Sequence, residues 1–92
     1  MRKHGRTDAN QAAIVKALRK AGASVQSLAS VGDGCPDLLV GYGVINFLIE
    51  VKDQNQPPSK RKLTPDETAW HGNWATPVYT VESVEEALDI IF

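Results

Sequence analysis

Residues 44–52 read VINFLIEVK, and this apolar run decides the fold because no other segment predicts a β-strand as strongly. Glu50 and Lys52 lie two positions apart, so a strand places both side chains on one face and Val51 on the other. A partly buried charge is costly unless an opposite charge or a metal ion compensates it. We therefore expect a functional site at the end of this strand.

A second acid is expected beside this strand end. Residues 37–40, DLLV, read as a short buried strand, and residues 41–43, GYG, read as the hairpin turn that joins the two strands. If the strands pair in this way, Asp37 and Glu50 can lie side by side. Two adjacent carboxylates repel each other, and a divalent cation removes that repulsion. Oxygen ligands alone select a hard cation such as magnesium.

Such a site predicts hydrolysis of a phosphodiester. Water at the cation can attack phosphorus, and the cation can stabilise the charge that develops on the phosphate. Lys52 would supply a positive charge beside that water or the scissile phosphate. We therefore expect Asp37, Glu50 and Lys52 to be catalytic, and Asp37, Glu50 and the Val51 carbonyl to hold the metal.

The remaining patterns predict helices and two further strands. A first helix has Asp8 and Gln11 as reciprocal caps and ends at Gly22. Capping sequences at residues 64–67 and 83–86 begin two more helices. The proline-rich segment before them reads as a loop. Weak alternation over residues 24–29 and the sequence at residues 77–81 predict strands. The order α-β-β-β-α-β-α describes an α/β domain with a mixed central sheet flanked by helices.

The net charge of −1 conceals an uneven distribution. Residues 1–62 contain all ten Lys and Arg and five acids, whereas residues 63–92 contain six acids and no Lys or Arg. This split hints at a basic surface for nucleic acid and is equally consistent with ordinary solvated charge. The candidate contacts to DNA phosphates are Lys60, Arg61, Lys62, Arg2, Lys3 and Arg6.

Length and composition exclude several classes of protein. The 92 residues, 42% of them hydrophobic, fit one globular domain over residues 1–92. No apolar run approaches the roughly 18 residues of a membrane span, and the basic start lacks the apolar stretch of a signal peptide. One cysteine suits a reducing cytosol, and one Cys with two His is too few for a structural zinc site. We expect a cytoplasmic protein with no membrane partner and no organic cofactor.

The motifs resemble those of a nuclease family. Pro36-Asp37 followed by Glu50-Val51-Lys52 resembles the PD-(D/E)xK superfamily. The longer strings resemble its VRR-NUC branch over nearly the whole chain: GCPDL at residues 34–38, IEVK at 49–52, LTPDE at 63–67 and SVEEA at 83–87. The resemblance implies a restriction-endonuclease-like core in a stand-alone nuclease of phage or bacterial type, related in fold to Holliday-junction resolvases.

The same resemblance implies a homodimer that uses Mg²⁺ or Mn²⁺ on branched DNA in a bacterial or phage-infected cell. Many relatives carry a Glu on the first helix that joins the metal site, and Gln11 occupies that position here. Gln11 is therefore a candidate catalytic residue that could hold a water molecule or a phosphate. Its alternative role is only to complete the helix cap with Asp8.

Several functions remain open at this stage. The leading one is a structure-selective endonuclease for four-way junctions, because two cuts related by a twofold axis suit a C2 dimer. Flap, single-strand or duplex cleavage is the alternative within the nucleases. A non-cutting DNA-binding module and an interaction domain with an acidic docking surface are the alternatives outside them. The apolar residues expected to serve the dimer interface are Trp70, Trp74, Tyr79, Ile90, Ile91 and Phe92.

Overall fold

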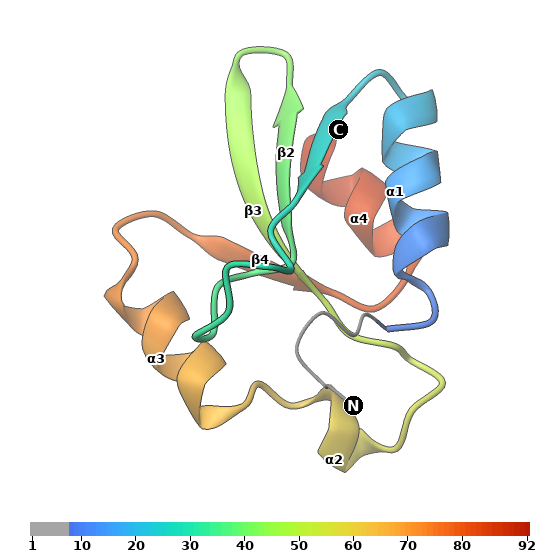
Figure 1. The fold of residues 1–92 in the computed structure, drawn as a ribbon. Coiled ribbons are helices and arrows are strands. Elements are labelled where there is room, and N and C mark those ends of the chain that lie inside the picture. The colour runs from blue at the N-terminus through green and yellow to red at the C-terminus, as the bar shows by residue number, and fades with distance from the viewer. Residues whose placement is uncertain (1–7) are drawn as a thin grey trace.

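The computed structural model describes residues 8–92 (Figure 1), so the basic residues Arg2, Lys3 and Arg6 lie outside the described part of the chain. The elements are α1 (Gln11–Lys20), β1 (Ser24–Ser27), β2 (Leu38–Tyr42), β3 (Ile45–Val51), α2 (Pro58–Arg61), α3 (Pro65–Asn73), β4 (Val78–Val81) and α4 (Val84–Ile91). None of the helices in this described part is long and apolar enough to cross a membrane.

The strands form one mixed sheet, as the sequence predicted. Their order is β1-β2-β3-β4, with antiparallel pairing among the first three strands and parallel pairing between β3 and β4. The α2 and α3 helices lie in the connection from β3 to β4. Figure 1 shows α1 and α4 together on one side of the sheet, whereas α2 and α3 lie towards the end at which β3 finishes.

The core forms between the sheet and the α1–α4 pair. Alternate residues of the central strands point into it, and Leu38 pairs with Ile49 in register while both are fully buried. Ile14 and Leu18 of α1 cover them at helical spacing. The alternation that sends Ile49 and Val51 into this core sends Glu50 to the opposite face of β3.

The first helix begins differently from the prediction. Its N-cap is Asn10, without a side-chain capping hydrogen bond, so the expected reciprocal cap of Asp8 and Gln11 is wrong. The Asn10 amide instead donates to the carbonyl oxygens of Lys52 and Glu82, each at 3.0 Å. These long-range bonds fix the start of α1 to the ends of β3 and β4. The expected helix end is correct, because Gly22 adopts a left-handed φ of 101° just after it.

Two further segments differ locally from the sequence-based expectation. The proline-rich segment, expected as a loop, contains the single turn of α2, which begins at Pro58. The hairpin turn is also tighter than expected, because Tyr42 pairs with Ile45 and leaves only Gly43 and Val44 between them. Gly43 accommodates this turn with a φ of 63°.

The two predicted capping boxes have different outcomes. At α3 both halves are present: Thr64 Oγ1 accepts from the Glu67 amide, and the Glu67 carboxylate accepts from the Thr64 amide. At α4, Ser83 Oγ accepts from the Glu86 amide, but Glu86 accepts from the amide of Glu82. In the second box the reciprocal hydrogen bond therefore comes from the residue before the N-cap and not from the N-cap itself.

Candidate active site

The ends of two paired strands bring the predicted acids together. Because Leu38 pairs with Ile49, Asp37 comes to lie beside Glu50, as the hairpin pairing implied. The Asp37 Oδ2 atom accepts a 2.7 Å hydrogen bond from the Val51 amide, and Glu50 is close enough to influence the pKa of Asp37. The backbone of Val51 thus orients Asp37, while its side chain is buried in the core.

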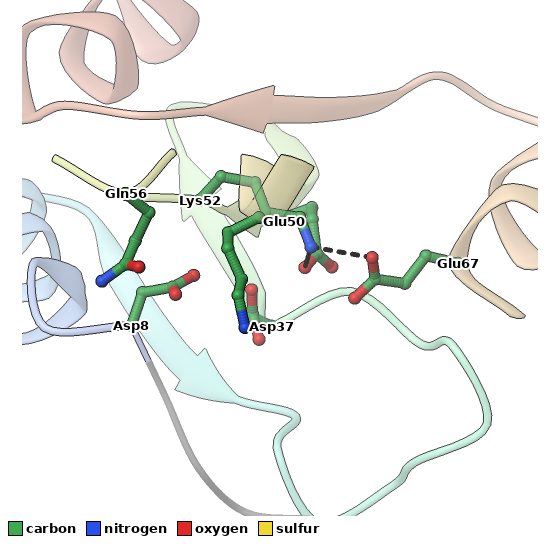
Figure 2. Close-up of a pocket in the computed structure, with 7 residues that line it drawn as sticks. Asp8, Asp37, Glu50, Lys52, Gln56 and Glu67 are labelled. Atoms are coloured by element: carbon green, nitrogen blue, oxygen red, sulfur yellow. Dashed lines mark hydrogen bonds and ion pairs between the residues drawn. The ribbon is translucent and has the colours of Figure 1, made fainter. Parts of the chain in front are cut away.

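A polar cavity of about 370 Å³ lies over this pair (Figure 2). Its lining consists of charged and amide side chains: Asp8, Asp37, Glu50, Lys52, Gln56, Lys60 and Glu67. Figure 2 shows Glu50 and Lys52 at its centre, with Glu67 on one side and Asp8 on the other. The cavity therefore joins β3 to residues from α2, α3 and the segment before α1.

The pKa of Glu50 is strongly raised in this cavity. Its side chain is only 3% exposed, and burial together with the neighbouring charge of Asp37 raises the pKa of Glu50 to about 9. Burial also raises the pKa of Asp37, although the hydrogen bond from Val51 opposes that shift. The Glu50 Oε1 atom is buried without a hydrogen-bond partner. A buried carboxylate with a free oxygen and an acidic neighbour favours a positively charged ligand.

Lys52 is held at the same strand end. Its Nζ atom lies 2.8 Å from Glu67 Oε1 and 3.6 Å from Glu50 Oε2, and its side chain is 8% exposed. Burial lowers the pKa of the Lys52 ammonium, but the hydrogen bond and charge of Glu67 outweigh burial and raise it. Lys52 is therefore a buried positive charge next to the acidic pair.

The donor set fits a hard divalent cation. Two adjacent buried acids, one with an unpartnered oxygen, are suitable oxygen ligands. Within residues 8–92, no three His, Cys, Asp or Glu side chains gather closely enough to hold a metal on their own. Magnesium tolerates this, because it commonly uses one or two carboxylates and fills its other positions with water and phosphate oxygens.

Comparison with known proteins supports a domain type. No family model and no curated protein matches the chain. One solved structure, described as a VRR_NUC domain, is similar at 26% sequence identity and a TM-score of 0.65. The alignment covers 99% of this chain and 96% of that structure. The chain is similar to this VRR-NUC domain over nearly its whole length. The match confirms the predicted fold and supports a VRR-NUC domain, the PD-(D/E)xK superfamily is consistent with it, and the similarity suggests a nuclease domain.

Sequence reasoning missed the positions of two acids, Asp8 and Glu67. Asp8 was expected to cap a helix, but it lines the cavity, where burial and Asp37 raise its pKa. Glu67 does cap α3, and it also contacts Lys52. No local pattern distinguishes Asp8 from an ordinary cap. For Glu67, the motif LTPDE was visible in the sequence, but its contact with Lys52 depends on how the chain folds back.

Gln11 is not among the residues that line the cavity. It is 6% exposed, and its Oε1 atom is buried without a partner. It lies instead in a shallow depression along α1, together with Ala12, Val15, Lys16 and Arg19. The structure therefore places Gln11 near the start of α1 without grouping it with Asp37 and Glu50.

The three predicted basic residues after β3 have different environments. Lys60 is exposed and lines the cavity, and Lys62 is exposed beyond it. Arg61 is partly buried, and its Nη1 atom lies 3.2 Å from Glu82 Oε1. Lys60 and Lys62 are therefore available to an incoming phosphate, whereas Arg61 links α2 to the residue that follows β4.

Proposed function

We propose that this VRR-NUC domain is a metal-dependent, structure-selective DNA endonuclease. The observation that carries the proposal is the buried Asp37–Glu50 pair, with an unpartnered Glu50 oxygen, in a cavity that also contains the Lys52 ammonium. A protein that only grips DNA has no use for clustered carboxylates near phosphate, because they repel it. Phosphodiester hydrolysis gives each of these groups a purpose.

Asp37 and Glu50 would hold Mg²⁺ or Mn²⁺, with the Val51 carbonyl as a further candidate ligand. When bound, the cation supplies Lewis-acid stabilisation of the charge that develops on the scissile phosphate. Asp37 is oriented for this role by its hydrogen bond from the Val51 amide. Lys52 would place its positive charge beside the reacting phosphate, where a preorganised charge acts without reorganisation. Exposed Lys60 would meet the incoming backbone at the edge of the cavity.

We propose a four-way junction as the substrate and a C2 homodimer as the active form. One domain has one such cavity among its described residues, and a dimer would supply the second cut in a symmetric position. Two residues expected at the interface are exposed, Trp74 at 49% and Phe92 at 73%, whereas Ile91 belongs to the core. The interface would therefore use fewer C-terminal residues than the sequence suggested. The proposed location is the cytoplasm of a bacterial or phage-infected cell.

The test is a cleavage panel with matched variants. Four-way junction, flap, splayed and linear duplex DNA are incubated with Mg²⁺, Mn²⁺ or EDTA. The wild-type domain should cut the junction fastest and only with metal. Asp37→Asn should abolish cutting, while Asp33→Asn, an exposed acid in the preceding turn, should retain it. Full cutting by Asp37→Asn would refute the proposed active site. If the wild-type domain bound DNA without metal-dependent cutting, the non-cutting DNA-binding module would be favoured.

The oligomeric state is tested separately by sedimentation. A homodimer has about twice the chain mass of 10.0 kDa. A monomer that cuts linear duplex as fast as a junction would refute both the dimer and the junction preference. If the domain cut a flap faster than a four-way junction, the junction preference would be wrong and a flap would be the substrate.

A further inference from the structure

A carboxylate oxygen of Glu67 links the first turn of α3 to the site. Glu67 Oε1 accepts from Lys52 Nζ at 2.8 Å and from the Thr64 amide at 2.9 Å. The Glu67 side chain is only 18% exposed. One carboxylate oxygen therefore serves both a helix cap and the only lysine that lies within ion-pairing distance of Glu50 in the described part of the chain.

The other helix cap of this kind shows that the lysine is not needed for capping. Glu86 occupies the same third position of α4 and reaches back to the Glu82 amide at 2.6 Å. Within residues 8–92, no Lys or Arg forms an ion pair with Glu86. Capping alone therefore does not account for the contact between Glu67 and Lys52.

The position of Glu67 is fixed relative to the acidic pair. Gly34 precedes Asp37 and packs so closely on α3 that a Cβ atom there would overlap the Asp66 carbonyl and lie 2.9 Å from the Glu67 nitrogen. The turn that leads to Asp37 thus rests directly on the first turn of α3. Glu67 is held in place from both directions, by its own cap and by this contact.

We propose that Glu67 is a positioning residue that keeps the Lys52 ammonium from closing its 3.6 Å ion pair with Glu50 to hydrogen-bonding distance. The proposal rests on the proposed nuclease function and adds α3 to its active site. Lysine is a flexible point charge, and without Glu67 the 3.6 Å separation from Glu50 could close. Lys52 would then compete with a cation for Glu50 and would no longer be aimed at the phosphate.

Kinetics of four proteins test this role: wild type, Glu67→Ala, Glu67→Gln and Thr64→Ala. Glu67→Ala should lower kcat about tenfold or more with KM within about twofold, because misplacing a group that acts on the reacting phosphate costs rate. Glu67→Gln keeps an oxygen that can accept from Lys52 and should recover part of that loss. Thr64→Ala removes the other half of the cap, so it should lower Tm by about 4–8 °C and keep kcat.

Two outcomes would overturn the proposal. If Thr64→Ala lost as much kcat as Glu67→Ala, fraying of α3 would explain the effect. If Glu67→Ala kept wild-type kcat, Lys52 would need no positioning. Assays at a temperature well below the lowest Tm of the set keep all four proteins folded during the comparison.

A second readout separates this inference from the nuclease function. In the DNA-free and metal-free domain, the ordered Lys52 ammonium should give a resolved ¹⁵N–¹H signal, assigned by its loss in Lys52→Ala. The signal should persist in Thr64→Ala and disappear or shift in Glu67→Ala. An unchanged signal in Glu67→Ala would refute the positioning role. Failure of the wild-type domain to cut any DNA would refute only the proposed function.

Discussion

The carboxylate of Asp37 accepts a 2.7 Å hydrogen bond from the backbone amide of Val51. A side chain that lies just before β2 is thereby tied to the last residue of β3, the strand that contains Glu50. This bond gives Asp37 Oδ2 a hydrogen-bond donor, whereas Glu50 Oε1 is buried without a hydrogen-bond partner. The two acids are therefore unequal, and Glu50 is the more sensitive to protonation and to cations.

The pH dependence of stability should report on Glu50. Its folded pKa is about 9, against 4.5 for the ordinary side chain. Between these values the folded domain holds a proton that the unfolded chain has lost, so stability should fall as pH rises through this window. Glu50→Gln should remove much of this slope and raise the Tm of the metal-free domain near pH 8. Urea titrations from pH 5 to about 9 in EDTA measure it, and an unchanged slope in the variant would contradict the assignment.

Lys52→Ala should lose catalytic rate far more than DNA affinity. Lys52 is buried beside the acidic pair rather than on an exposed surface, so it acts on the reacting group more than on the general charge of the backbone. Removal of one preorganised charge at a reacting centre commonly costs about 10²–10³-fold in kcat. Single-turnover cleavage and fluorescence anisotropy without cutting metal separate the two quantities. A larger loss in affinity than in rate would place Lys52 in DNA binding.

The basic residues after β3 should divide into two classes. Lys60→Ala with Lys62→Ala should weaken DNA binding and reduce its salt slope by up to about two units, one for each phosphate that the variant no longer neutralises. Arg61→Ala should leave that slope unchanged, because Arg61 is paired with Glu82. Its partly exposed ion pair should cost about 1 kcal/mol of stability or less. Salt titrations in the Asp37→Asn background avoid cleavage, and an altered slope for Arg61→Ala would show that this side chain also reaches DNA.

Gly34 and Gly32 offer a matched test of the contact between α3 and the turn before Asp37. Both have left-handed φ values, 87° and 75°, so alanine should cost about 1–2 kcal/mol at either position from backbone strain. Only at Gly34 would the new methyl group overlap the Asp66 carbonyl, since Gly32 faces open space. Overpacking should add about 1–3 kcal/mol at Gly34. Thermal unfolding measures the difference in stability between the two variants. Equal losses of stability would mean that α3 can move away from the turn at no energetic cost.

Local sequence patterns were sufficient to predict the part of the site that the β2–β3 hairpin forms. Alternation along β3 placed Glu50 and Lys52 on one face, and a short hairpin brought Asp37 to them. The cap of α3 could also be predicted, because Thr64 and Glu67 satisfy each other within four residues. These features depend on residues that are close in sequence.

The missed features depend on contacts between distant segments. Asp8 was expected to cap the first helix, but Asn10 occupies the cap position and its side chain bonds to Lys52 and Glu82. Nothing near Glu67 indicates that its carboxylate will meet Lys52, because that contact requires the β3–β4 connection to fold back. The α2 helix was missed for a different reason: a single turn is too short to show helical periodicity.

The mixed pairing of the sheet has a consequence for the order in which the site is assembled. Asp37 and Glu50 belong to a hairpin that needs only a two-residue turn, whereas β4 pairs with β3 only after the whole α2–α3 connection has been closed. Loop closure makes distant pairing the slower event. A growing chain would therefore bring its two acids together before Glu67 and β4 arrive. Their repulsion then opposes completion of this hairpin at the end away from its turn, and a proton or a cation that relieves it would assist folding.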